Sequence, residues 1–212
     1  VRETVFAVST SESRPVLTGV HWEVKNGELV CVATDSHRLA RRKTTLEQMP
    51  EGEYSVVIPG KSLNELSKII GDSSEAVNIV MTQQQVLFKT SDVLFYSRLL
   101  EGNYPDTSRL IPNEYKTTVT VNGKALLQAI DRASLLAREE RNNIVRFSSL
   151  EGNVVEISSS SPEVGKVEEE IQATSIEGEE LKISFSAKYM MDALKAVDGQ
   201  DAFEKAQLQT FD

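Results

Sequence analysis

The chain has 212 residues, enough for one large domain or two ordinary domains that each bury a core. Its 23 Lys and Arg against 32 Asp and Glu give a formal net charge of −9, which disfavours nucleic-acid binding unless the basic residues gather on one face. The single cysteine excludes an internal disulfide, and no Cys or His cluster has zinc-site spacing, so we expect no metal and no cofactor. No apolar run approaches the roughly 20 residues of a spanning helix, and we expect a soluble, cytoplasmic protein without a membrane role.

The first third of the chain predicts a short helix followed by a hairpin and a second helix. Residues 1–13 have valines spaced for one buried helical face before a polar loop. Residues 20–24 alternate apolar and polar, Asn26-Gly27 is a strong hairpin signal, and residues 29–34 form the return strand. A strand at 56–58 then leads through Pro59-Gly60 into a helix from about 61 to 70 that ends at Gly71.

Strand-like runs follow at 77–81, 85–89 and 93–100, and then a segment rich in turn formers, 101–112. We place a domain boundary near Pro112, which gives a first domain of residues 1–112.

The second half repeats this plan. A strand at 118–121 precedes a helix from about 124 to 138, and a hairpin pairs 144–150 with 154–158. The polar run 158–162 is expected to be a loop, and the last helix covers 187–197. This second domain would span residues 113–200, with residues 201–212 as a separate tail.

One strand-turn-helix pattern occurs three times, each with a lysine at the start of the helix. Lys124 follows Lys61 by 63 residues, and Lys188 follows Lys124 by 64. Such a period indicates a duplicated supersecondary unit of about 60 residues. We therefore predict an α+β fold of repeated units, each with one helix and antiparallel strands, and with the helices on one concave face.

The three repeated helices share a basic stripe opposite their apolar side. Lys124, Gln128 and Arg132 lie at i, i+4 and i+8, and the lysines of each of the other two helices are seven residues apart. Any amphipathic helix has a charged side, but three equivalent stripes in an acidic protein favour a sequence-independent DNA contact. The candidate DNA-binding residues are Arg14, Lys61, Lys68, Lys124, Gln128, Arg132, Lys188 and Lys195.

Four runs carry a resemblance to a known family. Leu17-Thr-Gly19, Val32-Ala-Thr-Asp-Ser-His-Arg-Leu39, Ser97-Arg-Leu-Leu-Glu-Gly-Asn-Tyr-Pro-Asp106 and Lys182-Ile-Ser-Phe-Ser-Ala-Lys-Tyr189 are similar to the bacterial DNA polymerase III beta subunit, the sliding clamp, of Gram-positive type. The resemblance covers about residues 1–200 and implies the clamp's middle domain followed by a truncated C-terminal domain. It implies the DNA clamp fold, whose members close around duplex DNA as a ring of two subunits and hold the replicative polymerase on its template without catalysis of their own.

The resemblance also implies a pocket for partner peptides of the form Gln-Leu-x-x-Phe, carried by the polymerase, the clamp loader and other proteins. Its apolar side chains and few polar groups suit an extended peptide. The residues that match the pocket are Leu17, Thr34, His37, Arg38, Leu39, Pro105, Arg109, Leu110 and Tyr189. Ring closure is not expected for this chain, because the first clamp domain and the end of the third are missing from it.

The sequence allows three other interpretations. The tail contains Gln207-Leu208-x-x-Phe211, which resembles the partner peptide and could occupy the pocket of its own or a neighbouring chain. Asp35-Ser36-His37 has the residue types of a hydrolase triad, but consecutive residues of a strand point to opposite faces and cannot form the chained hydrogen bonds of a triad without a sharp turn, so catalysis is not expected. A β-rich protein-interaction module without a DNA role remains the alternative.

Overall fold

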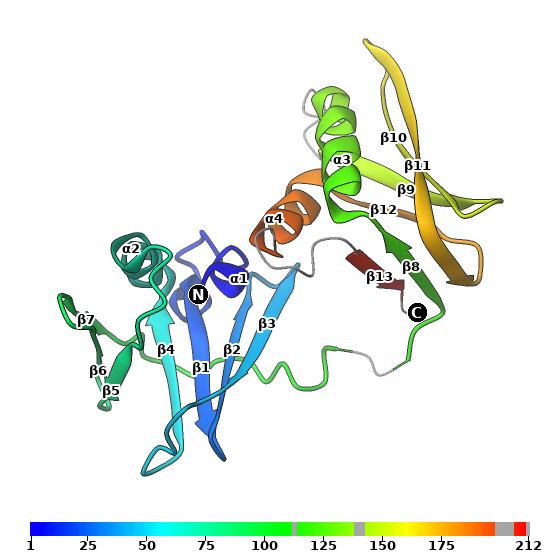
Figure 1. Cartoon of the computed structure of the whole chain (residues 1–212). Helices are drawn as coiled ribbons and strands as arrows, with labels where there is room; N and C mark the ends of the chain where they lie inside the picture. The colour runs from blue at the N-terminus through cyan, green and yellow to red at the C-terminus, as the bar shows by residue number, and fades with distance from the viewer. Residues whose placement is uncertain (112–113, 138–142, 198–205, 211–212) are drawn as a thin grey trace. The chain divides into compact units, whose positions relative to one another are not determined.

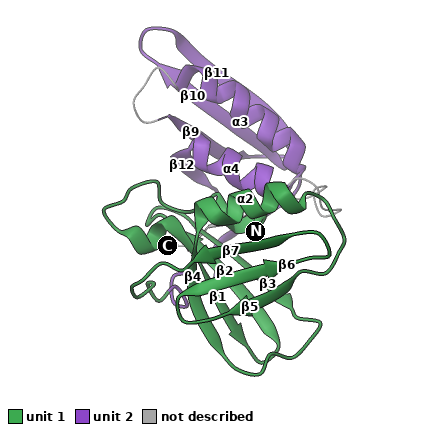
Figure 2. Ribbon diagram, turned by 90° about the vertical axis from the view of Figure 1, so that its left-hand side faces the viewer, with its two compact units in different colours: residues 1–106 green, residues 107–212 purple. Residues whose placement is uncertain are grey.

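The structure, a computed structural model, describes residues 1–111, 114–137, 143–197 and 206–210. It divides into two compact units, Val1–Asp106 (unit 1) and Thr107–Asp212 (unit 2), coloured separately in Figure 2. The division precedes the boundary near Pro112 that the turn formers suggest. Two hydrogen bonds explain why residues 99–106 stay with unit 1: the Leu100 N–H donates to the Val57 carbonyl, and the Thr34 N–H donates to Tyr104 Oη.

Unit 1 contains two antiparallel sheets and two α-helices (Figure 1). A four-stranded sheet has the order β3-β2-β1-β4, and a three-stranded sheet has the order β5-β6-β7. The elements in chain order are α1 (Arg2–Val5), the 3-10 helix η1 (Pro15–Thr18), β1 (Gly19–Lys25), β2 (Glu28–Thr34), β3 (Leu39–Thr45), β4 (Tyr54–Pro59), α2 (Gly60–Ile70), β5 (Asn78–Met81), β6 (Gln85–Lys89) and β7 (Leu94–Arg98).

In the described part of unit 2 the strands form a sheet with the order β12-β9-β10-β11-β8-β13, and helices α3 and α4 pack against each other (Figure 1). Helix α3 contacts β9, β10 and β11, which places it over one face of the sheet. The elements are β8 (Thr117–Val121), α3 (Gly123–Ala137), β9 (Ile144–Leu150), β10 (Val154–Ser161), β11 (Gly165–Gly178), β12 (Lys182–Ser186), α4 (Ala187–Val197) and β13 (Ala206–Thr210).

The predicted strand-helix repeat is confirmed. Strands β4, β8 and β12 each lead directly into a helix, and the repeated lysine is the second residue of that helix in all three copies. The helices form because apolar residues recur every three to four positions, and each buries that side in its own unit. The α+β class is therefore correct.

Each unit has its own core. In unit 1, Trp22 packs edge-on against Phe88 at a ring separation of 5.8 Å, with Leu63 and Leu66 of α2 in the same cluster. In unit 2, Leu126 and Ile130 of α3 pack with strand residues that include Phe147.

Several sequence-based boundaries were wrong. The polar run 158–162 was expected to be a loop, but β10 continues through Ser161, because Ser158–Ser161 pair with β11. The N-terminal helix covers only residues 2–5, and Val1 is exposed rather than on a buried face. Strands β3, β11 and β13 were not predicted.

The backbone of residues 206–210 forms β13, which pairs antiparallel with β8. This segment therefore adds an edge strand to the sheet of unit 2. Phe211, the aromatic end of the peptide-like motif, lies outside the described residues.

Helices of the length and apolarity that crossing a bilayer requires do not occur in the described ranges. A group of three or more His, Cys, Asp or Glu residues able to hold a metal ion was likewise not found in the part of the chain that the structure describes.

Candidate nucleic-acid and peptide interfaces

Helix α3 has the clearest basic stripe. Lys124, Gln128 and Arg132 are exposed, whereas Leu126 and Ile130 on the opposite side are fully buried. The helix is held in place by a buried hydrogen bond in which Ser159 Oγ of β10 donates to the Ala133 carbonyl at 2.6 Å. The stripe is therefore fixed relative to the sheet beneath it.

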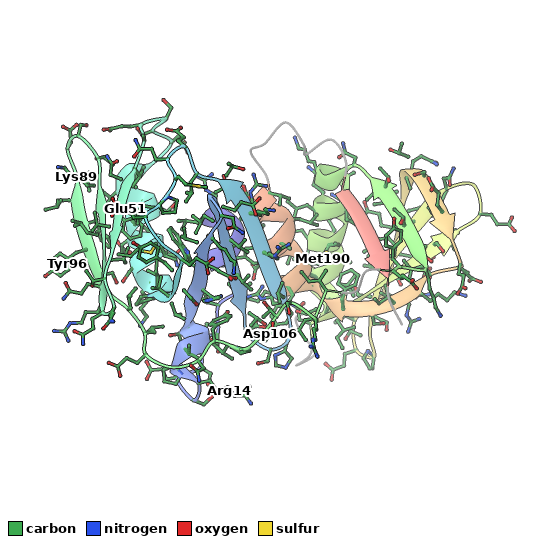
Figure 3. The ribbon with its side chains drawn as sticks, turned by 90° about the horizontal axis from the view of Figure 1, so that it is seen from below. Arg14, Glu51, Lys89, Tyr96, Asp106 and Met190 are labelled. Carbon is green, nitrogen blue, oxygen red and sulfur yellow. The ribbon has the colours of Figure 1, made fainter. Side chains whose placement is uncertain are left out.

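Helices α2 and α4 also expose their lysines. Lys61 and Lys68 are exposed on α2, and Lys188 and Lys195 on α4, opposite buried leucines. Val197, the last residue of α4, is exposed. Arg14 is exposed in the segment that precedes η1 (Figure 3).

Three of these cations have a carboxylate partner. Lys68 Nζ lies 2.8 Å from Glu65, and Lys188 Nζ lies 2.7 Å from Asp192, each within one turn of its own helix. Arg132 instead contacts Glu169 on β11 with two nitrogens, Nε donating to Oε2 at 2.8 Å and Nη2 to Oε1. This bidentate bond lowers the pKa of the Glu169 carboxyl.

Six residues of the candidate peptide site belong to unit 1, and four of them lie in one tight turn. After β2 ends, the Asp35 carboxylate accepts the backbone N–H groups of His37 and Arg38 at 2.9 and 3.0 Å. Thr34 Oγ1 donates to the Arg38 carbonyl at 2.7 Å. Asp is well suited to such a turn because its side chain bonds the backbone two and three residues on. The turn presents His37 to solvent and leaves Leu39 half-buried at the start of β3.

Arg38 is largely occupied within unit 1. Its Nε donates to Asp35 Oδ2 at 3.1 Å, its Nη2 donates to the Phe6 carbonyl at 2.8 Å, and its guanidinium lies over the Phe6 ring. Only 15% of the Arg38 side chain and 12% of the Asp35 side chain are exposed. The turn is thereby fastened to the segment that follows α1.

Tyr104 fastens the other side of the turn. Its Oη accepts the Thr34 N–H at 3.0 Å, and its ring stacks on His21 at 5.1 Å with an interplanar angle of 12°. His21 Nε2 shares a hydrogen bond of 2.8 Å with Ser55 Oγ of β4. Burial raises the pKa of Tyr104 to about 12, so the hydroxyl stays protonated at neutral pH.

The remaining candidates differ in exposure. Leu17 is buried in unit 1 with 3% exposed, and Pro105 is exposed beside Tyr104. In unit 2, Arg109 and Leu110 are exposed and Tyr189 of α4 is half-buried. The sequence interpretation missed Asp35, Tyr104, His21 and Phe6, which position the turn. An Asp two residues before the His-Arg pair was the available signal for Asp35.

The structure corrects the reason given against a hydrolase triad. Residues 35–37 form a turn, with Ser36 at a positive φ of 78°, and not a continuation of the strand. The Asp35 carboxylate nevertheless bonds two backbone N–H groups and Arg38, so it is committed to the turn.

The repeated strand-helix unit, the helices with exposed lysines and the paired antiparallel strands define the class of modular α+β folds from which DNA clamps are built. Comparison with solved structures agrees: the crystal structure of a DNA polymerase sliding clamp from Bacillus subtilis superposes with a TM-score of 0.92 at 61% identity, over 99% of this chain and 54% of that one. A sliding clamp from Pseudomonas aeruginosa, at 29% identity, gives a TM-score of 0.89 over 100% of this chain and 56% of its own.

The chain belongs to the DNA polymerase III beta subunit family. The model of the family's central domain matches residues 1–106, and the model of its C-terminal domain matches residues 108–208, which extends into the predicted tail. The chain is 63% identical to the beta sliding clamp of Bacillus subtilis (strain 168) and 55% identical to that of Staphylococcus aureus (strain Mu50 / ATCC 700699). Each match covers 95% of this chain and 53% of the relative, so the chain spans about half the length of these relatives.

Proposed function

We propose that the chain is the middle and C-terminal part of a DNA sliding clamp, a processivity factor that performs no catalysis itself. In a complete ring of two subunits it would surround duplex DNA without reading sequence and tether the replicative polymerase. The observation that carries this proposal is the family match over both units, with an exposed lysine as the second residue of three equivalent helices.

The physical argument concerns charge placement. A protein with a net charge of −9 repels DNA in general. The position of its exposed cations on the helices therefore matters more than how many cations it has. Duplex DNA carries one charge per roughly 1.7 Å, and contacts from lysine and arginine to phosphate do not depend on sequence. We assign the eight candidate residues of the basic stripes and the loop before η1 to this contact.

Salt-dependent DNA binding tests the proposal. A variant in which Lys124, Arg132, Lys188 and Lys195 are changed to Gln should bind a duplex more weakly than the parent at low salt, with a flatter dependence of affinity on salt. The matched control changes Lys25, Lys43, Lys89 and Lys182, four exposed lysines of strands, to Gln and alters the net charge equally. Equal losses in both variants would favour the alternative, a β-rich interaction module without a DNA role.

We further propose that the Asp35 turn and its neighbours bind peptides of the form Gln-Leu-x-x-Phe from the polymerase, the clamp loader and other partners. The turn is rigidly held, with an exposed imidazole at His37 and an apolar edge at Leu39 and Pro105, which is the combination a short peptide requires. The resemblance also implies Arg109, Leu110 and Tyr189 of unit 2, and these three stay predictions from the sequence.

Titration with a labelled peptide of this form tests the site. We expect weak but measurable binding that Leu39→Ala lowers several-fold. Leu94→Ala removes a leucine that is exposed on β7, in the other sheet of unit 1, and serves as the control. A Leu39→Ala protein that binds as tightly as the parent would remove this turn from the proposed site.

A further inference from the structure

Glu169 occupies an unusual position in the sheet of unit 2. Along β11 the residues on the helix side are Val167, Glu169, Ile171 and Ala173. The three apolar residues of this row pack against the core of unit 2. The intervening Glu168 and Glu170 are exposed. A carboxylate in an apolar row loses hydration and needs a charged partner, which here is Arg132.

The Arg132–Glu169 pair is held by two anchored elements. The residue next to Arg132, Ala133, is tied to β10 by Ser159, and Glu169 is paired through the backbone to Ile157 of β10. Both partners therefore start from fixed positions, so the pair forms with less loss of side-chain freedom than one between mobile lysines and glutamates. The Glu169 side chain is 27% exposed and the Arg132 side chain 54%, so solvent and other anions can reach the guanidinium.

We infer that Glu169 is an internal competitor for the DNA phosphates that Arg132 would contact. A guanidinium binds a carboxylate and a phosphate through the same bidentate geometry, so a phosphate must displace Glu169 or share the arginine with it. The inference rests on the proposed function, because it assumes that α3 faces DNA. Its consequence is a DNA contact weaker than the exposed cations alone would give, which suits a protein that must move along its duplex.

The same pair could be a purely structural link between α3 and β11. A structural link predicts that neutralising Glu169 lowers the melting temperature and leaves DNA affinity unchanged. Competition predicts higher DNA affinity whatever the change in melting temperature. Simple repulsion of DNA by Glu169 predicts a gain that does not depend on Arg132.

A double-mutant cycle separates these cases. Glu169→Gln is measured in the parent and in an Arg132→Gln background, with Glu170→Gln as the control that removes an equal charge from the adjacent, outward-facing position. Binding of a duplex is followed from about 50 to 200 mM salt, together with melting temperature. We expect E169Q to raise affinity about threefold over E170Q, in keeping with the modest strength of exposed ion pairs, and to steepen the salt dependence by about 0.9. The gain should vanish when Arg132 is absent.

Each outcome decides. The inference would be overturned if E169Q and E170Q bound DNA with equal affinity, or if the gain from E169Q persisted in the R132Q background. In either case, DNA binding by the parent would leave the proposed function in place. A parent that binds DNA at no salt concentration, while E169Q does bind, would support both. Absence of binding in every variant would overturn both the inference and the DNA role.

Discussion

At the scale of single residues, the stacked pair His21 and Tyr104 joins two parts of unit 1. It connects β1 to the segment that follows β7, and Tyr104 in turn holds the end of β2 through the Thr34 N–H. Stacking of this kind is worth about 0.5–1.5 kcal/mol beyond the area that it buries. The candidate peptide turn therefore depends on a contact made outside it.

This contact predicts a pH dependence of stability. Burial lowers the pKa of His21 below its ordinary value of 6.5, an effect that Glu23 partly opposes. The unfolded chain then binds the proton more tightly than the folded one, so the contribution is complete above about pH 6.5 and is lost as the pH falls below it. Acidification from about pH 7.5 to 5.5 should lower the melting temperature of the parent more than that of His21→Gln.

The second histidine provides the control for this measurement. His37 is exposed on the turn, so His37→Gln should retain the contribution of His21. A His21→Gln protein whose melting temperature falls as steeply with acid as that of the parent would contradict the assignment to His21.

The residues of the candidate turn could be named from the sequence, but their contacts could not. The run from Thr34 to Leu39 was identified by resemblance, and it does form one turn. Arg38 shows the limit: its partners, the Phe6 carbonyl and ring, lie 32 residues away in the chain, and no local pattern indicates them. Tyr104 lies 70 residues from Thr34 for the same reason.

At the scale of elements, the helices α2, α3 and α4 were predictable, whereas the strands β3, β11 and β13 were not. The helices α2, α3 and α4 follow an apolar period of three to four, which identifies their boundaries to within a residue or so. Strand β3 has exposed basic and threonine residues at the edge of its sheet. In β11 the apolar row of Val167, Ile171 and Ala173 is interrupted by Glu169, which obscures the alternation in the sequence. Their pairing with β2 and β10 decides their conformation instead of their own side chains.

Helix α3 allows a matched test of how its buried side stabilises unit 2. Leu126 is completely buried against the core, and Leu135 on the same helix is 59% exposed. Leu126→Ala should lower the free energy of unfolding of unit 2 by about 3 kcal/mol, because it removes buried methyl groups and leaves a cavity. Leu135→Ala should change it by less than about 0.5 kcal/mol. Urea denaturation measures both, and equal effects would mean that the helix is not packed as described.

At the scale of the whole molecule, the two units have separate cores and match separate family domains. The repeat at intervals of 63 and 64 residues indicated this modular plan from the sequence alone. The charge distribution is the less predictable part. The stripes were visible as spacing, but the pairing of Arg132 with Glu169 joins residues 37 positions apart and needs the sheet to bring them together.

The proposed clamp function also predicts how this chain behaves on circular DNA. A clamp that has closed around DNA is retained by topology and survives salt that screens its charges, whereas an open piece is retained only by those charges. This chain corresponds to about half of the curated clamps that it matches. We therefore predict that the 212-residue chain dissociates from a nicked circular plasmid and from the same plasmid made linear at the same salt concentration. Gel filtration measures this, because bound protein co-elutes with the plasmid. The prediction would be contradicted if the chain stayed on the circular plasmid at about 0.5 M salt and was released when the plasmid was made linear. Only a closed ring is held on a circle and slides off the ends of a linear duplex.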